Sequence, residues 1–454
     1  MSLGQNLQLV AEATSPEQFE TFQKHMDPQW IDEALSVTGK ASVRKRLLPA
    51  EQVVWLVIGM GIFVKKGLRE IVESLDLVLP TAKKIGFMAS SAISQARARL
   101  GQNPMRWLFK RSGDEWSRRS ADAHRWRGLA LFGIDGTTLR VADSQENRDS
   151  FGGQSADAKR GASGYPLLRL VALMVLRSHI LKDTAAGPYK GSSEASLSQE
   201  LLRQIPDDSL TVMDRGFVNP GTLVPLARGG HNRHWLTRAK KNTAWKVIRR
   251  LGRGDDLVEM KVSSDARKKD PSLPATWTAR AIAYQRKGFR PQTLLTSLLD
   301  PTKYPAAEIV LLYHERWELE LGFDELKTEM LDRQETIRSK TAEGVYQEAW
   351  GLLTAYNLIR VEMEQVAAEA GVPPMRISFT IALHLIQDEL MWCRAASPGT
   401  IPAKLRRLRG NVARFVLPPR RGDRSYPRAV KIKMSNYKRK RPTTTDAPAS
   451  GGLK

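Results

Sequence analysis

The sequence has very little cysteine, no long apolar run and no secretion signal. Cys393 is the only cysteine among 454 residues, which excludes an internal disulfide and a zinc site built from thiolates. The longest apolar run, Val53–Val64, is far shorter than the roughly 20 residues that span a bilayer, so it predicts a buried helix. The N-terminus lacks a basic region followed by an apolar one. We therefore expect a cytoplasmic protein without a membrane partner.

Acidic residues are few compared with basic ones. The chain has 71 Lys and Arg against 48 Asp and Glu, a formal net charge of +23. Such an excess favours a polyanionic partner, because each phosphate that a protein neutralises releases a condensed counterion. Nucleic acid is the expected partner, although ribosomal proteins and membrane-surface proteins share the signature. The stretch from Lys404 to Arg441 holds 15 Lys and Arg and one acid, Asp423.

Apolar periodicity and turn residues divide the chain into five segments. Helical patterns in 19–35, 48–64, 66–80 and 89–101 predict an N-terminal helical domain over residues 1–112. Short apolar runs and one helix predict a mixed α/β sheet over 113–242, followed by a β-rich insertion over 243–305. Helices return over 306–398, and 399–454 is a basic C-terminal region with a disordered end.

The helix expected over residues 89–101 carries Arg97 and Arg99. It follows a helix and a turn, as the reading helix of a small DNA-binding bundle does, so both arginines are candidate DNA contacts. The segment by itself fits a basic surface helix in any helical bundle equally well.

Two aspartates follow apolar runs that we expect to be strands. Asp135 stands in "LFGIDGTTLR" and Asp214 in "LTVMDRGF". An acid at the end of a strand emerges at the carboxyl edge of the sheet, where α/β folds place ligand chemistry. Each of them, considered alone, is also compatible with an ordinary turn, since Asp-Gly is a common turn pair.

A third acid lies in "YHERWELELGFDELK". At about 100° per residue, one regular helix brings four polar side chains into a stripe about 60° wide. These are Tyr313, Arg316, Glu320 and Lys327, and apolar residues border them on both sides. The remaining glutamates, Glu315, Glu318 and Glu325, are expected on the far, solvated face. The alternative is a structural helix in which Glu320 pairs with Arg316 and Tyr313 packs in the core.

Three carboxylates without a Cys or His cluster favour Mg²⁺, with Mn²⁺ as a substitute. Two such ions about 4 Å apart can activate a water or a 3′-hydroxyl and stabilise the leaving oxygen of a phosphodiester. Arg316 and Lys327 would donate to the flanking phosphates, and Tyr313 and Trp317 could stack on an unpaired base. Further candidate DNA contacts follow the predicted strands: Arg215, Arg238 and Lys240.

These residues resemble the signature of a large bacterial insertion-sequence family of DDE transposases. The spacing Tyr313-x₂-Arg316-x₃-Glu320-x₆-Lys327 is similar to its YREK motif, and Asp135 and Asp214 look like its first two acids. The segments "WGLLTAYNLIR" and "YPRAVKIKMSNYKRKRP" also resemble the corresponding segments of family members, as does the helical N-terminus. The resemblance therefore covers roughly residues 15–441.

The resemblance implies an RNase H-like core, interrupted before the Glu320 helix by a β-rich insertion. It also implies divalent-metal-dependent cleavage of double-stranded DNA at terminal inverted repeats, a hairpin on the element end, and strand transfer to target DNA by a homodimer assembled on two ends. Relatives hold a flipped base with a tryptophan where this chain has Gln292 and Thr293. We leave that role unassigned, with Trp277 and Trp317 as alternatives.

Two other functions compete with this interpretation. The chain could be a different RNase H-like nuclease, from which strand transfer into a second duplex would distinguish it. It could also be a DNA-binding regulator with incidental acids, for which Asp135→Ala would leave all activity intact.

Overall fold

A computed structural model describes residues 25–42, 48–75, 77, 88–154, 164–286, 290–332, 336–393 and 401–418. The elements expected from the sequence can be compared with these residues only, and the basic stretch beyond Pro418 lies outside them. None of the helices in these ranges is long and apolar enough to cross a bilayer.

A nine-stranded mixed sheet forms the centre of the molecule, in the order β3-β2-β1-β4-β5-β9-β8-β7-β6. β1, β4 and β5 run parallel to one another, whereas β2 and β3 are antiparallel to their neighbours. This half of the sheet has the RNase H-like arrangement that the resemblance implied. Its strands are β1 (Ala130–Arg140), β2 (Leu167–Val175), β3 (Leu181–Pro188), β4 (Ser209–Met213) and β5 (Arg233–Arg238).

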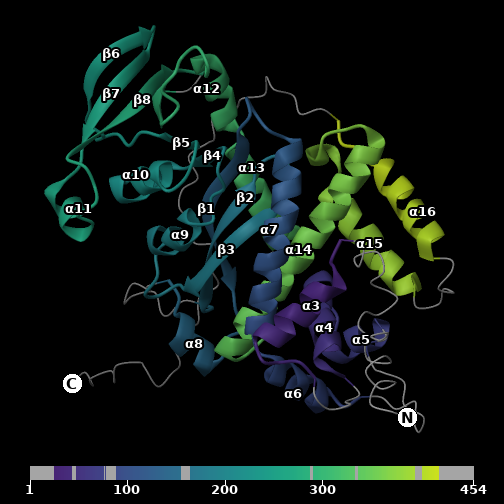
Figure 1. The fold of residues 1–454 in the computed structure, drawn as a ribbon. Coiled ribbons are helices and arrows are strands. Elements are labelled where there is room, and N and C mark those ends of the chain that lie inside the picture. The colour runs from purple at the N-terminus through teal and green to yellow at the C-terminus, as the bar shows by residue number, and fades with distance from the viewer. Residues whose placement is uncertain are drawn as a thin grey trace, which may run out of the picture.

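Helices cover both faces of this half of the sheet (Figure 1). Leu131 and Leu139 of β1 point into a core shared with α7 (Asn103–Ala123) and α14 (Ala342–Ala370). Phe132 and Ile134 point the other way, into a core shared with α9 (Glu194–Leu202) and α10 (Pro220–Arg228). The strand is apolar on both faces because both are covered.

The N-terminal helices pack directly on the core. They are α3 (Pro28–Val37), α4 (Ala50–Ile62), α5 (Leu68–Ser74) and α6 (Ser90–Leu100), and α4 lies against α14. The two helices meet at glycines: a Cβ on Gly351 would come within 2.6 Å of the Val57 carbonyl oxygen, and one on Gly61 within 2.9 Å of the Leu352 Cα. The predicted buried helix over Val53–Val64 is confirmed, since α4 is buried along almost its whole length.

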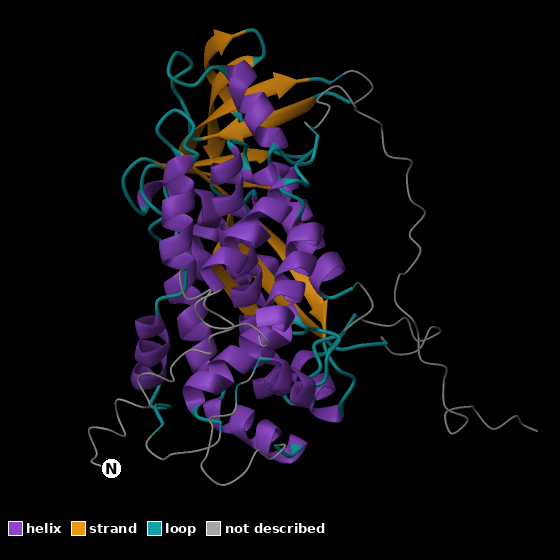
Figure 2. Ribbon diagram, turned by 90° about the vertical axis from the view of Figure 1, so that its right-hand side faces the viewer, coloured by secondary structure: helices purple, strands orange, loops and turns teal. Residues whose placement is uncertain are grey.

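The β-rich insertion extends the same sheet. β9 (Gln292–Thr296) pairs antiparallel with β5, and β8 (Thr276–Tyr284), β7 (Asp255–Lys261) and β6 (Lys246–Gly252) follow outward, with the short α11 (Ser264–Lys269) between β7 and β8. Figure 2 shows the orange strands passing from the helix-covered core into this outer part. The domain boundaries stay predictions, and α7 runs across the one placed between residues 112 and 113.

Three consecutive elements replace the single regular helix that the sequence predicts for Tyr313–Lys327. α12 (Ala306–His314) ends before Glu315, α13 (Trp317–Asp324) follows, and a π-helix, η3 (Glu325–Met330), continues from it. The chain then continues into α14, against which α8 (Gln145–Phe151) packs. The 3₁₀ turn η4 (Pro374–Arg376), α15 (Phe379–Cys393) and α16 (Ile401–Ala413) complete the described part.

Candidate active site

Asp135 and Asp214 come from two neighbouring parallel segments of the chain. Ile134 of β1 pairs with Met213 of β4, and in each segment the next residue is an aspartate. β4 ends there, and Asp214 begins the 3₁₀ turn η2 (Arg215–Phe217), where its side chain accepts a 2.6 Å hydrogen bond from the Gly216 N–H. Asp135 differs from the prediction, because it lies inside the 11-residue β1 rather than at its end.

The surroundings of Asp135 disfavour its charge. Burial raises the pKa of Asp135 from 3.8 to about 6, and the nearby charge of Asp214 adds to this effect. A hydrogen bond from the Gly136 N–H and the charge of Arg316 act in the opposite direction without offsetting it. Sequence reasoning missed another contributor, Glu194 at the start of α9, whose first-turn position gave no functional signal.

Arg316 links the third acid to the first. Its guanidinium donates a 2.8 Å hydrogen bond to Glu320 Oε1, and its other terminal nitrogen lies 3.9 Å from Asp135 Oδ2. The alternative of a purely structural helix is thus correct in part, since Glu320 does pair with Arg316 and Tyr313 is buried. However, the pair faces Asp135 of the sheet, with α13 packed against β1.

The three carboxylates have the chemistry that binds a divalent cation, and two of them are already close to each other. All of their donors are carboxylate oxygens, and a cation between Asp135 and Asp214 would offset both the burial of the Asp135 charge and the lesser repulsion by Asp214. Within the described ranges, no group of three Asp, Glu, His or Cys residues is close enough to hold a metal ion. Glu320 would have to exchange Arg316 for the ion in order to complete the site.

The remaining candidate residues, two from the predicted stripe and two tryptophans, differ in their burial. Tyr313 is 7% exposed, and burial raises the pKa of its hydroxyl. Lys327 is half-buried in η3, and Trp317 is exposed, with the Arg316 guanidinium 5.8 Å from its ring centroid. Trp277, the other tryptophan considered for base contact, is instead buried against Trp235.

Three predicted DNA contacts lie at the carboxyl end of the parallel strands. Arg215 is exposed directly after Asp214. Arg238, the last residue of β5, donates a 3.1 Å hydrogen bond to Gln292, and the Lys240 ammonium donates one of the same length to the Val218 carbonyl. The parallel register brings these cations to the edge that holds the aspartates.

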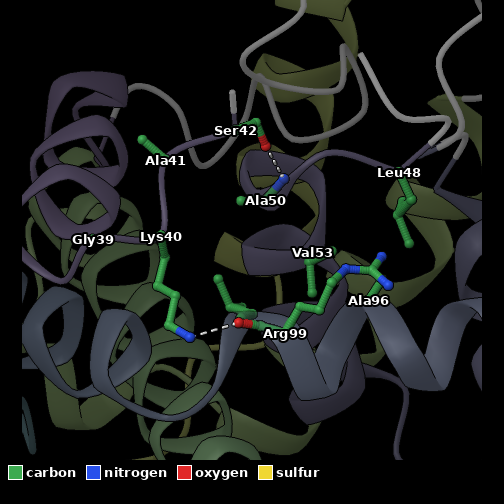
Figure 3. A pocket seen from close by; sticks show the side chains of 10 residues that line it. Gly39, Lys40, Ala41, Ser42, Leu48, Ala50, Val53, Ala96 and Arg99 are labelled. Atoms are coloured by element: carbon green, nitrogen blue, oxygen red, sulfur yellow. Dashed lines mark hydrogen bonds between the residues drawn. The ribbon is translucent and has the colours of Figure 1, made fainter. Parts of the chain in front are cut away.

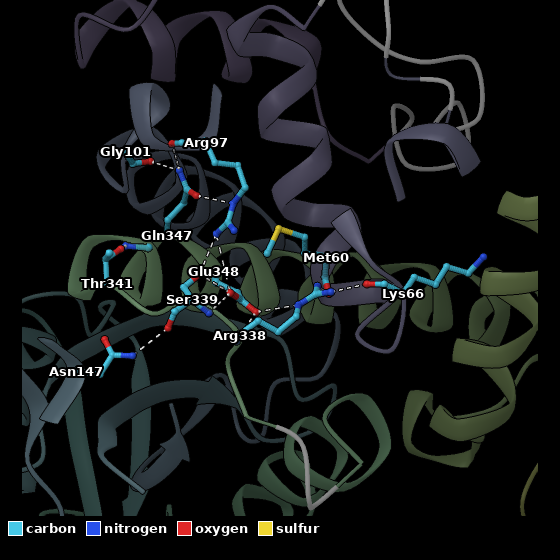
Figure 4. A network of polar contacts seen from close by, with 11 residues as sticks. Met60, Lys66, Arg97, Gly101, Asn147, Arg338, Ser339, Thr341, Gln347 and Glu348 are labelled. Carbon is cyan, nitrogen blue, oxygen red and sulfur yellow. Dashed lines mark hydrogen bonds and ion pairs between the residues drawn. The ribbon is translucent and has the colours of Figure 1, made fainter. Parts of the chain in front are cut away.

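The structure separates the two arginines of α6. Arg97 points inward, where it donates 3.0 Å hydrogen bonds to Gln347 and Ser339 and lies 3.9 Å from Glu348 (Figure 4). Burial lowers the pKa of its guanidinium. Arg97 therefore attaches the N-terminal helices to α14. This position does not favour a DNA contact, and that role stays a prediction.

Arg99 stays exposed at the rim of a cavity of about 260 Å³ between α6 and the loop after α3. Figure 3 shows Lys40 on the same rim, donating a 2.8 Å hydrogen bond to the Arg99 carbonyl. Arg99 remains a candidate DNA contact.

The prediction of a solvated far face on the Glu320 helix is wrong. Glu315 forms an ion pair with Arg177, with a 2.8 Å contact, while Glu318 and Glu325 both contact His179, which is fully buried. These partners are distant in the sequence, so periodicity within the helix could not identify them.

Two family descriptions match this chain. Residues 16–110 match the insertion element 4 transposase N-terminal family, and residues 126–358 match the transposase DDE domain family. The chain is also 38% identical over 439 residues to transposase InsG for insertion sequence element IS4 of Escherichia coli (strain K12), which covers 96% of this chain and 98% of that protein. A solved piggyBac transposase synaptic complex with hairpin DNA is 11% identical, with a TM-score of 0.42 over 90% of this chain and 87% of its own, too distant to support an argument.

The sheet, the carboxylates on it and the second of these matches define a DDE transposase. More narrowly, the chain belongs to the family of the IS4 transposases. It is thus an enzyme that acts on DNA, and membership of the DDE class implies that its activity depends on a divalent metal.

Proposed function

We propose that this chain excises and inserts an insertion sequence, with Asp135, Asp214 and Glu320 as the carboxylates of its active site. The observation that supports the assignment most directly is the register of β1 and β4, which places two aspartates next to each other, together with Arg316, which lies between Asp135 and Glu320. Its DNA substrates are the terminal inverted repeats and a target duplex.

Asp135 and Asp214 would hold the metal, and Glu320 would complete the set once it releases Arg316. Two Mg²⁺ ions, with Mn²⁺ as a substitute, would activate the attacking oxygen and stabilise the leaving oxygen of the phosphodiester. A phosphate entering the site offers Arg316 a bidentate partner, because the guanidinium fork matches two phosphate oxygens. DNA binding would in this way free Glu320.

Other side chains of the site hold the DNA. Lys327 and Arg316 contact the phosphates on either side of the scissile bond, and Trp317 offers an exposed ring to an unpaired base. Arg215, Arg238 and Lys240 form a cationic rim along the same edge of the sheet, where phosphates can follow the strand ends. These contacts support a hairpin intermediate, in which a sharply bent DNA end needs many cationic partners.

The acting species is a homodimer on two transposon ends. Cleavage and joining of both ends at one target requires two such active sites, and each chain described here contains one set of three carboxylates. The reaction takes place where bacterial DNA is found, at the nucleoid.

Cleavage of a labelled duplex that carries the terminal repeat tests this proposal. Wild type and Glu320→Ala are compared with Mg²⁺, with Mn²⁺ and with EDTA. We expect metal-dependent nicking followed by a hairpin in wild type, and DNA binding without nicking in the variant, because the phosphate contacts remain. Tight binding by wild type without nicking under either metal would contradict the proposal. Normal nicking by Glu320→Ala would remove that residue from the site.

A further inference from the structure

A buried polar cluster lies behind the helix that carries Glu320. His179, in the turn between β2 and β3, is fully buried and has a left-handed backbone with φ of 64°. Its Nε2 lies 3.0 Å from Glu318 and its Nδ1 lies 3.2 Å from Glu325. One imidazole thus contacts two acids of the catalytic segment, one in α13 and one at the start of η3.

Helix α14 supplies the rest of the cluster. The Arg360 side chain, 1% exposed, forms an ion pair with Glu325, and the Tyr356 hydroxyl donates a 2.8 Å hydrogen bond to the same carboxylate. Arg360 Nη2 also lies 2.5 Å from His179 Nδ1. Three side chains of the cluster, from His179, Tyr356 and Arg360, thus meet at the Glu325 carboxylate.

The charge of Glu325 is well compensated. Burial by itself would raise its pKa, but the charges and hydrogen bonds of Arg360 and His179 together outweigh burial and hold the pKa at about 2. The carboxylate is therefore ionised at neutral pH.

The cluster contacts one side of α13, and Glu320 projects from the opposite side. Glu320 follows Glu318 by two residues, which is about 200° around an α-helix, so a side chain held at Glu318 turns Glu320 towards the other side. There Glu320 faces Asp135 through Arg316. The two residues that the cluster holds thus define the rotation of α13 about its own axis.

Helix α13 needs such a restraint because it is short and irregular at both ends. It has eight residues, follows the break at Glu315 and Arg316, and passes directly into a π-helix. A π-turn changes the angle between residues before and after it, and Lys327 lies within this one. Glu325 is its first residue, so the cluster also fixes where the π-turn begins.

We propose that His179, Glu325 and Arg360 are positioning residues, which set the rotation of α13 and thereby direct Glu320 at the two aspartates. The inference rests on the proposed function of Glu320. Since a misplacement of about 1 Å at a reacting centre can cost about 10²-fold in rate, loss of the cluster should slow cleavage without preventing DNA binding.

Glu325→Gln is the first variant, because it removes the charge and keeps the size. Its matched control is Glu362→Gln, on the same helix as Arg360. Glu362 is likewise buried and paired with an arginine, Arg409, but this pair joins α14 to α16, away from the aspartates. His179→Asn is the second variant, since asparagine tolerates the left-handed backbone but is too short to bridge both glutamates.

Three quantities are measured for each variant well below its melting temperature. They are the affinity for terminal-repeat DNA in EDTA, the single-turnover nicking rate at saturating DNA, and the affinity for Mn²⁺ from the electron paramagnetic resonance of the free ion. We expect Glu325→Gln and His179→Asn to nick about 10- to 100-fold more slowly and to bind Mn²⁺ several-fold more weakly, with DNA affinity within about 2-fold of wild type. Glu362→Gln should keep all three values.

Two results would overturn the inference. One is nicking and Mn²⁺ binding at wild-type levels in both cluster variants. The other is an equal loss in Glu362→Gln, which would attribute the effect to general destabilisation. A third comparison separates this failure from failure of the proposed function, because wild type that never nicks, or Glu320→Ala that nicks normally, refutes the active site itself. If Glu325→Gln does not fold, His179→Asn decides, since it leaves the Arg360–Glu325 pair in place.

Discussion

Replacing Asp135 by Asn should stabilise the metal-free protein at neutral pH. The pKa of Asp135 is raised from 3.8 to about 6, a difference of about 2 units, and each unit corresponds to 1.36 kcal/mol. The side chain is only 21% exposed, so solvent screens this effect little. Ionised Asp135 therefore destabilises the fold by about 3 kcal/mol, and the neutral amide removes this cost while its Oδ1 can still accept from Gly136.

The sign of the effect sets its pH dependence. A raised pKa means that the folded protein binds the proton more tightly than the unfolded chain does. Well below pH 3.8 the group is protonated in both states and Asp135 costs nothing. The cost develops as the pH rises from about 3 to about 7, through both pKa values, so part of it is already present at pH 4.5. The stability advantage of Asp135→Asn should accordingly grow by about 2 kcal/mol between pH 4.5 and pH 7.5.

Denaturant unfolding in EDTA at pH 4.5, 6 and 7.5 measures this difference. Asp149→Asn, which removes an exposed carboxylate on α8, serves as the control for net charge. A difference between wild type and Asp135→Asn that is independent of pH would refute the electrostatic reasoning. Adding Mg²⁺ at pH 7.5 should then stabilise wild type more than the variant, because a ligand of the folded state raises stability by mass action. Equal stabilisation would show that Asp135 does not bind the ion.

Three further predictions concern DNA binding and packing. Arg97→Ala should lower the free energy of unfolding by about 2 kcal/mol, because Gln347 and Ser339 lose a charged hydrogen-bond donor. Arg99→Ala should change the free energy of unfolding by less than about 0.5 kcal/mol and reduce the salt slope of DNA binding by about 1. Equal effects of the two variants would refute the distinction. Gly351→Ala should cost about 1–3 kcal/mol in thermal or denaturant unfolding, because its Cβ would meet the Val57 backbone, and an unchanged midpoint would contradict this. Truncation after Pro418 should weaken DNA binding and flatten its salt dependence, measured by titration at several salt concentrations; an unaltered slope would mean that the tail does not contact DNA.

Local patterns were sufficient to find the sheet and most helices. β1 to β5 lie within the segment 113–242 for which a mixed α/β sheet was predicted, and α9 begins after a serine cap, Ser193. β6 gives little signal of its own, because its residues are nearly all exposed and its sequence is basic rather than alternating. Asp135 was expected at a strand end because it follows a short apolar run, but the β-prone residues after it continue β1 to Arg140 along its partner β2.

The catalytic segment marks the limit of a helical-wheel argument. The pairing of Arg316 with Glu320 could be predicted, because residues four apart are neighbours on any helix. The position of Lys327 relative to them could not, because a π-helix begins between Glu320 and Lys327. The break before Trp317 likewise changes the angle to Tyr313, and neither irregularity has a proline or glycine at its origin that would have indicated it.

Contacts between residues that are distant in the sequence bring the three carboxylates into one site. Asp135 and Asp214 meet only because β1 and β4 are parallel and in register. Glu320 joins them because α13 is docked from behind by His179, which precedes Glu318 by 139 residues. Local sequence patterns therefore identify candidate acids, whereas the sheet register and the buried ionic contact determine whether these acids can act together. The variants at Glu325 and His179 test the role of the buried ionic contact.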